Sequence, residues 1–399
     1  MSLLRTILAA VAALCFTTPA ALAQTDFAGW WRADITHGDE VEPFYFHFDT
    51  NDEGARRARM TIPIARMYEV QAGTYEVSDG ALRLPAFGLT FAVAADGSTI
   101  EGVFPPEFVT TVPISVRFVR AEAPAPPAQP APGGPAPTPI WTASVGGEIW
   151  AGLTLDGARA LFVGAADGHV VALSPATGAE QWRVNLGSPI HATPTLHRRR
   201  LYVATDAALV ALDARNGREI WRAAFGAERA PRLPISDPNS KWDHYSSSAV
   251  VDDRLAVVGS RDGCVYALYT RNGAERWKVC TEDLVTATPA LTREGVYFGG
   301  YDHRVYALSR TDGRELWRFD AEGIVPRDVI VADGNVIAGS RSYDIFAINA
   351  QTGAQAWRRY VWYSWIDSPP VYADGRIYSG SSDAVNVFAF DAATGARVW

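Results

Sequence analysis

The chain has little cysteine, methionine or histidine: its 399 residues include 3 Cys, 3 Met and 7 His. Only Cys264 and Cys280 lie beyond the first 23 residues, and no histidine is close to them in the sequence. Two cysteines alone make a poor metal site. The C-x-x-C-H pattern that attaches haem is also missing. The sequence therefore predicts neither a metal site nor a haem.

Positive charge is also scarce, because 36 Lys and Arg face 44 Asp and Glu and the formal net charge is −8. Binding to phosphate backbones needs a basic surface, so we expect no nucleic-acid partner. One local exception is the run His197-Arg198-Arg199-Arg200. It lies in a predicted hairpin loop, and we interpret it as a solvated turn rather than an anion site.

Beyond the N-terminus, no apolar run is long enough to span a bilayer. Residues 1–23 show a basic Arg5, an apolar stretch over residues 7–16, and small residues at Ala21 and Ala23. This pattern predicts a signal peptide that is cleaved after Ala23. Cys15 follows a leucine where a lipoprotein signal needs a small residue. We expect a soluble periplasmic or secreted protein with no transmembrane segment after cleavage.

What the chain does contain is one phrase repeated six times, as in A-L-S-R-T-D-G-R-E-L-W ending at Trp317. The period is about 40 residues, with a single longer spacing between Trp221 and Trp277. The unit after Trp277 predicts four strands, over residues 285–291, 295–299, 304–308 and 315–319, with tight turns between them. A repeat of this length predicts the four-stranded blades of a β-propeller.

The phrase resembles the tryptophan-docking repeat of the pyrroloquinoline quinone (PQQ) propeller superfamily over residues 141–399. The superfamily includes quinone-dependent dehydrogenases and cofactor-free scaffolds, such as the propeller lipoprotein of the outer-membrane barrel assembly machinery. We interpret the repeated tryptophans as wedges between blades rather than as a cofactor box. They are Trp141, Trp182, Trp221, Trp277, Trp317, Trp357 and Trp399.

The predicted fold class is all-β, with a propeller of about six blades over residues 140–399. Rings of this superfamily usually have seven or eight blades, so a truncated ring is the alternative. We expect residues 140–146 to form an outer strand that pairs near Val387–Phe390 and closes the ring, which would leave no exposed strand edge.

Residues 24–120 form a separate unit, in which apolar residues alternate, as at Phe44, Phe46 and Phe48. This alternation predicts a small antiparallel β-barrel or sandwich. Its opening residues, Gly29-Trp30-Trp31, resemble the start of lipocalin-like domains. Residues 121–139 are rich in proline and alanine and predict a semi-rigid linker.

Cys264 and Cys280 flank the turn at residues 271–273 at equal distances. They should therefore lie opposite each other across one hairpin, and we predict a disulfide in an oxidising compartment.

Loops of a propeller alternate between two faces. The connections between blades, together with the turns between second and third strands, form one face, here called the connection face. The long spacing after Trp221 reflects an insertion over residues 226–244 on this face, and long surface loops often carry specificity. The candidate binding residues on this face are Trp242, His244, Tyr245, Trp362, Trp365, His191, Arg327 and Asp367.

Aromatic anchors on a rigid ring favour a non-catalytic scaffold that binds a protein or peptide in the cell envelope, without a cofactor. The alternative is a dehydrogenase that uses PQQ with calcium and Asp367 as the base, although the expected vicinal cysteine pair is absent. A hydrolase built on Asp243, His244 and Ser246–Ser248 has suitable residue types, but neighbours in sequence rarely form a catalytic triad.

Overall fold

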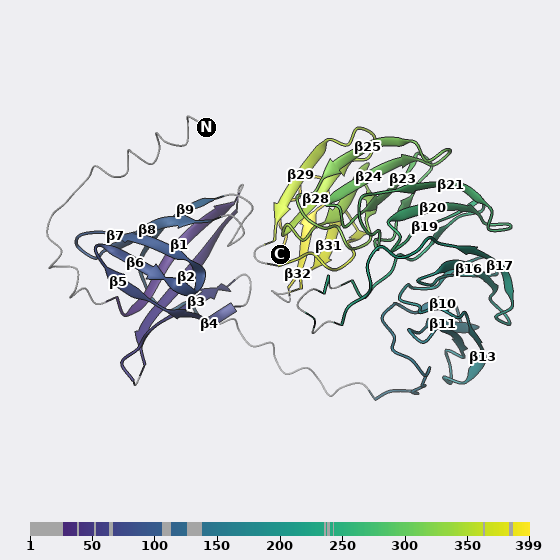
Figure 1. The fold of residues 1–399 in the computed structure, drawn as a ribbon, viewed down its shortest axis with the longest axis horizontal. Helices are drawn as coiled ribbons and strands as arrows, with labels where there is room; N and C mark the ends of the chain where they lie inside the picture. The colour runs from purple at the N-terminus through teal and green to yellow at the C-terminus, as the bar shows by residue number, and fades with distance from the viewer. Residues whose placement is uncertain are drawn as a thin grey trace. The chain divides into compact units, whose positions relative to one another are not determined.

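The computed structural model (Figure 1) describes residues 27–37, 40–51, 53–63, 67–105, 113–125, 138–234, 237, 240–241, 243–361, 364–382 and 386–399. The chain divides into two compact units, Met1–Gln129 and Pro130–Trp399, with the boundary inside the proline-rich segment 121–139. Apart from the short 3-10 helix η3 (Pro85–Phe87), the regular elements in the described ranges are strands, which confirms the all-β fold class. None of the helices in these ranges is long and apolar enough to cross a bilayer.

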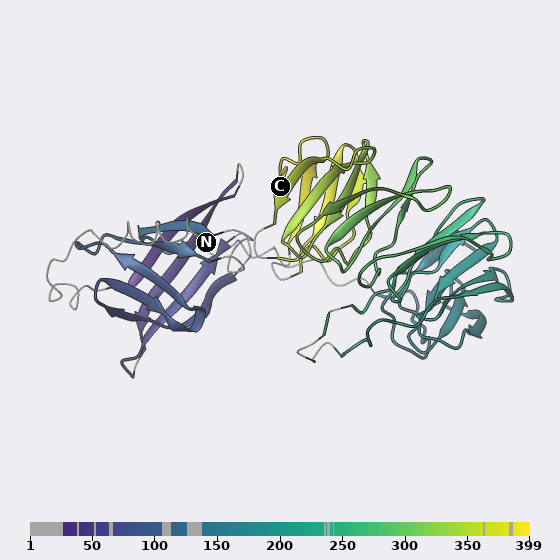
Figure 2. The ribbon, with the colours of Figure 1, turned by 45° about the horizontal axis from the view of Figure 1, so that its top comes forward.

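The first unit is one nine-stranded antiparallel sheet that curls into a nearly closed barrel (Figure 2). The strands lie in the order β4-β3-β2-β1-β9-β8-β7-β6-β5. Their bounds are β1 (Gly29–His37), β2 (Glu40–Thr50), β3 (Arg56–Ile62), β4 (Met67–Thr74), β5 (Glu76–Ser78), β6 (Ala81–Leu84), β7 (Leu89–Val93), β8 (Thr99–Phe104) and β9 (Ile114–Ala121).

Aromatic rings fill the interior of this barrel. The alternating Phe44, Phe46 and Phe48 of β2 are all at most 1% exposed, as strand geometry with one buried face requires. The ring of Phe46 lies 5.3 Å from that of Phe118 on β9. Trp31 is fully buried, and its indole N–H donates to the carbonyl of Phe27 at 3.1 Å, so its one polar atom is satisfied.

The second unit contains six antiparallel sheets among its described residues, which confirms the propeller blades. Five have four strands and the last has three, each in sequence order. Blade 1 is β10 (Thr154–Asp156), β11 (Ala160–Gly164), β12 (His169–Leu173) and β13 (Glu180–Asn185); blade 2 is β14 (Thr195–His197), β15 (Arg200–Ala204), β16 (Ala208–Asp213) and β17 (Glu219–Ala224); blade 3 is β18 (Val250–Val251), β19 (Leu255–Gly259), β20 (Cys264–Tyr269) and β21 (Glu275–Cys280); blade 4 is β22 (Ala290–Leu291), β23 (Gly295–Gly299), β24 (Arg304–Ser309) and β25 (Glu315–Asp320); blade 5 is β26 (Ile330–Ala332), β27 (Asn335–Gly339), β28 (Asp344–Asn349) and β29 (Gln355–Tyr360); blade 6 is β30 (Val371–Ala373), β31 (Arg376–Gly380) and β32 (Val387–Asp391).

The first strand of blade 4 is shorter than the sequence predicts. In blade 4 the ladder covers only Ala290–Leu291 of the predicted 285–291. Pro289 has no N–H to donate. The residues before it bond instead to the next blade: Thr286 donates to the carbonyl of Pro326 at 2.9 Å, and the Thr288 amide donates to Asp328 at 3.0 Å.

The predicted ring closure is wrong. Residues 140–146 form no strand, and the indole of Trp141 is held by the turn of blade 1. The free edge of β32 is taken by the residues that follow it, since Val398 and Ala389 bond at 2.7 Å and Arg397 bridges Phe390. In Figures 1 and 2 the six blades follow one another along an arc, with blades 1 and 6 at its ends.

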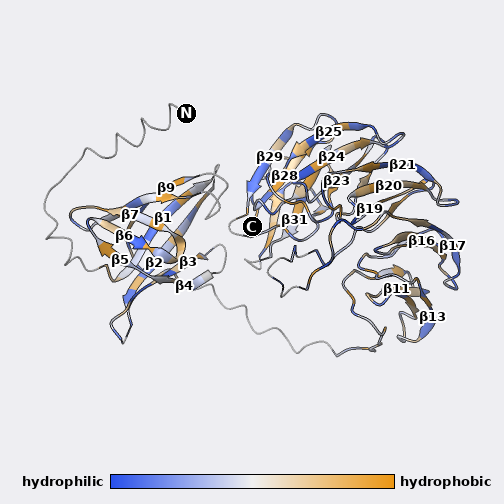
Figure 3. Ribbon diagram, viewed as in Figure 1, coloured by the Kyte–Doolittle hydropathy of each residue, from blue (hydrophilic) through white to orange (hydrophobic). Residues whose placement is uncertain are grey.

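The apolar residues concentrate in the second and third strands of each blade (Figure 3). Every residue of β23 is buried, whereas in β25 only Trp317 is buried and the other five residues are at least partly exposed. Blades stack face to face, so the middle strands are covered on both sides and only the outer strands show alternation. Repeated stacking of this kind buries a continuous core along the arc.

Tryptophans connect successive blades. Six of the seven predicted wedges place the indole ring against the glycine of the next turn between third and outer strands. Each of the six donates its N–H to a carbonyl of that turn at 2.8–3.2 Å. The acceptors are Pro175 for Trp141, Ala214 for Trp182, Thr270 for Trp221, Arg310 for Trp277, Ala350 for Trp317 and Ala392 for Trp357. Trp399 is 57% exposed.

Cys264 and Cys280 form a disulfide directly across the β20–β21 ladder, with Cα atoms 3.9 Å apart. The bond closes a loop with a sequence separation of 16 residues within one hairpin.

Substitution of two glycines of blade 5 can test how tightly the Trp317 indole packs on its turn. Both have positive φ, but a Cβ at Gly353 would lie 2.8 Å from the Trp317 ring, whereas a Cβ at Gly334 meets nothing within 4 Å. We expect Gly334→Ala to cost about 1–2 kcal/mol from backbone strain alone. Gly353→Ala should cost about 1–3 kcal/mol more because the indole must move. Urea unfolding of both variants measures the difference, and equal costs would show that the contact is not tight.

Removal of the disulfide should lower stability by about 2–4 kcal/mol, because the unfolded chain gains the entropy of an open loop. The comparison is urea unfolding of the oxidised protein and of the Cys264→Ala/Cys280→Ala variant. The wild type in reductant serves as the control and should resemble the variant. Alkylation of both thiols in exported protein would contradict the prediction.

Candidate functional site

The insertion on the connection face joins β17 of blade 2 to β18 of blade 3. The structure describes it except at residues 235, 236, 238, 239 and 242. Two candidate residues, Trp242 and Trp362, therefore lie outside the described residues. The other six candidates lie in the connections between blades and can be placed.

A buried ion pair holds the insertion to blade 3. Arg261, in the turn between β19 and β20, pairs with Asp243, and their side chains are 2% and 3% exposed. The same guanidinium donates to the carbonyl of Ala230 at 2.9 Å and lies 3.3 Å from Glu228. One side chain thus contacts the insertion near both of its ends. Loss of one partner from such a pair leaves a buried charge uncompensated.

A second charged group joins the insertion to blade 2. Asp206, in the turn between β15 and β16, lies 3.2 Å from His191 and 3.0 Å from Arg232. It also accepts a hydrogen bond from Ser246 at 3.1 Å. Burial alone would raise the pKa of Asp206, but the hydrogen bond from His191 and the charge of Arg232 outweigh it and lower the pKa. Asp206 is therefore an ionised anchor.

The end of the insertion reaches side chains from distant blades. His244 stacks on Trp150, which precedes blade 1, with ring centroids 4.8 Å apart. The next residue, Tyr245, lies under the guanidinium of Arg327 at 3.6 Å, in the connection from blade 4 to blade 5. This is close cation–π geometry. Tyr245 remains 39% exposed.

Arg341 orders the neighbouring part of the face. It forms an ion pair with Asp367 at 3.2 Å and lies 4.8 Å from the ring centre of Trp365. It also donates to the carbonyl of Lys241 at 2.7 Å, so it connects the insertion to blades 5 and 6. The cavity that Tyr245, Arg327, Arg341 and Asp367 help to line measures about 30 Å³. That volume holds about one water molecule.

The sequence proposed eight candidates for this face, of which six can be placed, but it missed three arginines that contact them or the insertion. These are Arg232 in the insertion and Arg261 and Arg341 in the turns between second and third strands. A signal for two of them exists, because Arg261 and Arg341 both follow Gly-Ser at the same point of the repeat. Sequence alone does not show that both turns point toward the insertion.

The family model PQQ_2, described as "Outer membrane protein assembly factor BamB", matches residues 136–279, 205–357 and 301–399. Together these matches cover more than half of the chain. The chain belongs to this family. No curated protein matches it.

Among solved structures, the chain is similar to the crystal structure of BamB from Moraxella catarrhalis. The TM-score is 0.53 and the identity 20%, over 78% of this chain and 84% of that one. At this identity the likeness concerns the fold.

The buried His244 predicts a pH-dependent stability. Desolvation lowers its pKa from the ordinary 6.5, and the positive charges of Arg232 and Arg261 act in the same direction, against the negative charge of Asp243. The unfolded chain therefore binds a proton at higher pH than the folded chain, so stability falls as the pH drops below about 6.5. The melting temperature should fall more between pH 7.5 and 5.5 in the wild type than in His244→Phe, which retains a ring against Trp150. Equal falls would contradict the assignment.

Proposed function

We propose that the protein is an exported scaffold that docks a protein or peptide partner on the connection face without performing catalysis. The observation that carries this proposal is a pair of aromatic side chains, the exposed Tyr245 and the half-buried Trp365, each of which lies against an arginine from another loop of this face. Aromatic side chains that are already ordered lose little entropy on binding and often dominate interface energies.

The family supports a role in the cell envelope. Its description names outer membrane protein assembly, and we propose that the partner belongs to that process. The signal-like residues 1–23 and the disulfide are consistent with a periplasmic or secreted location, where disulfides persist.

Contacts on the connection face favour the scaffold over the dehydrogenase alternative. Asp367, the candidate base, forms an ion pair with Arg341, and the adjoining cavity of about 30 Å³ is far below the roughly 300–1,000 Å³ of small-molecule sites. Among the placed residues, no group of three His, Cys, Asp or Glu side chains is arranged to hold a metal ion such as calcium. These observations support a function without PQQ.

The hydrolase arrangement is not formed either. Asp243 pairs with Arg261, whereas Ser246 donates to Asp206. Within the described part of the chain, Nε2 of the intervening His244 has no hydrogen-bond partner. The three residue types are adjacent in sequence but do not form a relay.

Site-specific photocrosslinking tests the docking face. A benzophenone side chain at Tyr245, in cells that export the protein, should produce one defined adduct with an envelope protein. Leu316 on the outer strand of blade 4 is the matched control, because it is 41% exposed against 39% for Tyr245. The control position should give no such adduct.

Substitution of Trp365 completes the test. When Trp365→Ala is added to the protein that carries benzophenone at position 245, the yield of the adduct should fall about tenfold or more, as expected for an aromatic hot spot. The melting temperature of this variant should stay within about 2 °C of that of the unsubstituted protein. In a domain of this size, such a shift corresponds to a loss of less than about 1 kcal/mol in unfolding free energy. Equal adducts at Tyr245 and Leu316, or an adduct that persists in the stable Trp365→Ala variant, would refute docking on this face.

A further inference from the structure

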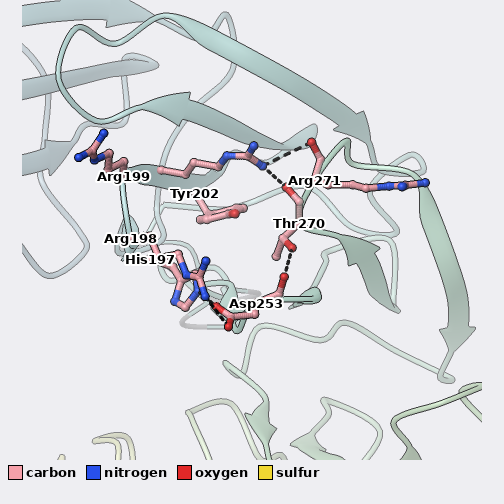
Figure 4. A pocket seen from close by; sticks show the side chains of 8 residues that line it. His197, Arg198, Arg199, Tyr202, Asp253, Thr270 and Arg271 are labelled. Carbon is pink, nitrogen blue, oxygen red and sulfur yellow. Dashed lines mark hydrogen bonds and ion pairs between the residues drawn. The ribbon is translucent and has the colours of Figure 1, made fainter.

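A second cavity lies away from the connection face, between blades 2 and 3 (Figure 4). Its volume is about 440 Å³. It opens on the opposite side, here called the turn face, which is formed by the loops between first and second strands and the turns between third and outer strands. Blade 2 contributes the loop His197–Arg200 and Tyr202, and blade 3 contributes Asp253, Thr270 and Arg271.

Tryptophan docking builds the inner wall of this cavity. The carbonyl of Thr270 accepts the indole N–H of Trp221 at 3.0 Å. The same carbonyl accepts a hydrogen bond from Nη1 of Arg200, which fixes this guanidinium across the blade interface. Tyr202 lines the cavity beside it, and burial raises the pKa of its phenol, which stays a neutral hydrogen-bond donor. The wall therefore presents an ordered cation and a hydroxyl.

Positive charge exceeds negative charge around the cavity. Four arginines line it, and its one acidic residue is Asp253. Asp253 is already paired with Arg198 at 2.5 Å and with His197 at 2.9 Å. For Arg199 and Arg271, the structure shows no acidic partner among the residues that it describes. Figure 4 shows these two side chains on opposite sides of the cavity, both directed away from it, so that a change of rotamer would bring each guanidinium to the opening.

We infer that this cavity binds a small polyanion with two or more carboxylate or phosphate groups. Arg200 and Tyr202 would contact one group at the inner wall, and Arg199 and Arg271 would contact another at the rim. Guanidinium groups match the planar oxygen pairs of both anions. The volume lies within the usual range for small-molecule sites. The loop that the sequence presented as a solvated turn thus forms one wall of an anion site.

The neighbouring interface offers a matched control. Between blades 3 and 4 lies a cavity of about 360 Å³ lined by Arg254, Arg276, Arg293 and Arg310. There Arg310 pairs with Asp252, and Arg276 donates to the carbonyl of Thr311 at 2.7 Å. No tyrosine lines this cavity among the described residues. Removing two rim arginines here changes the net charge as much as removing two from the first cavity.

Isothermal titration calorimetry with citrate and with pyrophosphate, at constant ionic strength, tests the inference. At least one probe should bind the full-length secreted protein, and the stronger probe identifies carboxylate or phosphate as the preferred group. Arg199→Gln/Arg271→Gln should weaken that binding about tenfold or more, since hydrogen bonds to charged groups are lost. Arg254→Gln/Arg293→Gln should weaken it less than about threefold.

Three results would overturn the inference. They are no heat of binding for either probe, unchanged affinity in Arg199→Gln/Arg271→Gln, and equal weakening in both double variants, which would indicate general charge attraction. All four side chains lie on surface loops, so both variants should keep the wild-type melting temperature. If melting shifts, the single variant Arg271→Gln is used in the same comparison, with Arg293→Gln as its control.

Discussion

The docking of each tryptophan onto the turn of the following blade is the contact on which the rest of the propeller depends. The indole fills the space over a glycine and satisfies its own N–H on a backbone carbonyl, so one residue sets both the distance and the orientation between two sheets. Stacking then covers the middle strands, such as the wholly buried β23, on both faces. The same contact orients Thr270 and, through it, Arg200 on the turn face.

This dependence explains what the sequence could predict. Blade boundaries and turns are encoded locally, because the glycine and the tryptophan recur with fixed spacing, and the structure reproduces strands such as Gly295–Gly299. Ring closure is not local. Trp141 has the spacing of an outer-strand tryptophan, but its indole docks on the turn of the blade that follows it, blade 1. The edge of β32 pairs with the residues that follow β32 in the chain. The first strand of blade 4 is short because residues before it donate hydrogen bonds to the connection that leads to blade 5. The sequence of one repeat does not reveal hydrogen bonds between repeats.

The candidate site was partly predictable for a similar reason. Register within the repeat placed His191, Tyr245 and Asp367 on the connection face. The arginines that organise this face act between blades, and a spacing pattern within one repeat contains no information about such pairs. Arg261 is the clearest case, since it is almost fully buried and its partner Asp243 is 18 residues earlier in the sequence, in the insertion. A buried ion pair contributes little net stability, but it penalises any arrangement that separates the two charges.

We propose that the ion pair of Asp243 and Arg261 fixes the insertion across the connection face in a conformation that can receive a partner. Hydrogen–deuterium exchange in Asp243→Asn tests it most directly, with Asp283→Asn as the control, because Asp283 pairs with Lys241 of the insertion at the surface. Exchange should accelerate in residues 226–234 and 243–249 of Asp243→Asn, remain at wild-type rates in the middle strands of the blades, and stay near wild type throughout Asp283→Asn. Unchanged exchange in the insertion, or acceleration across all blades, would contradict the account.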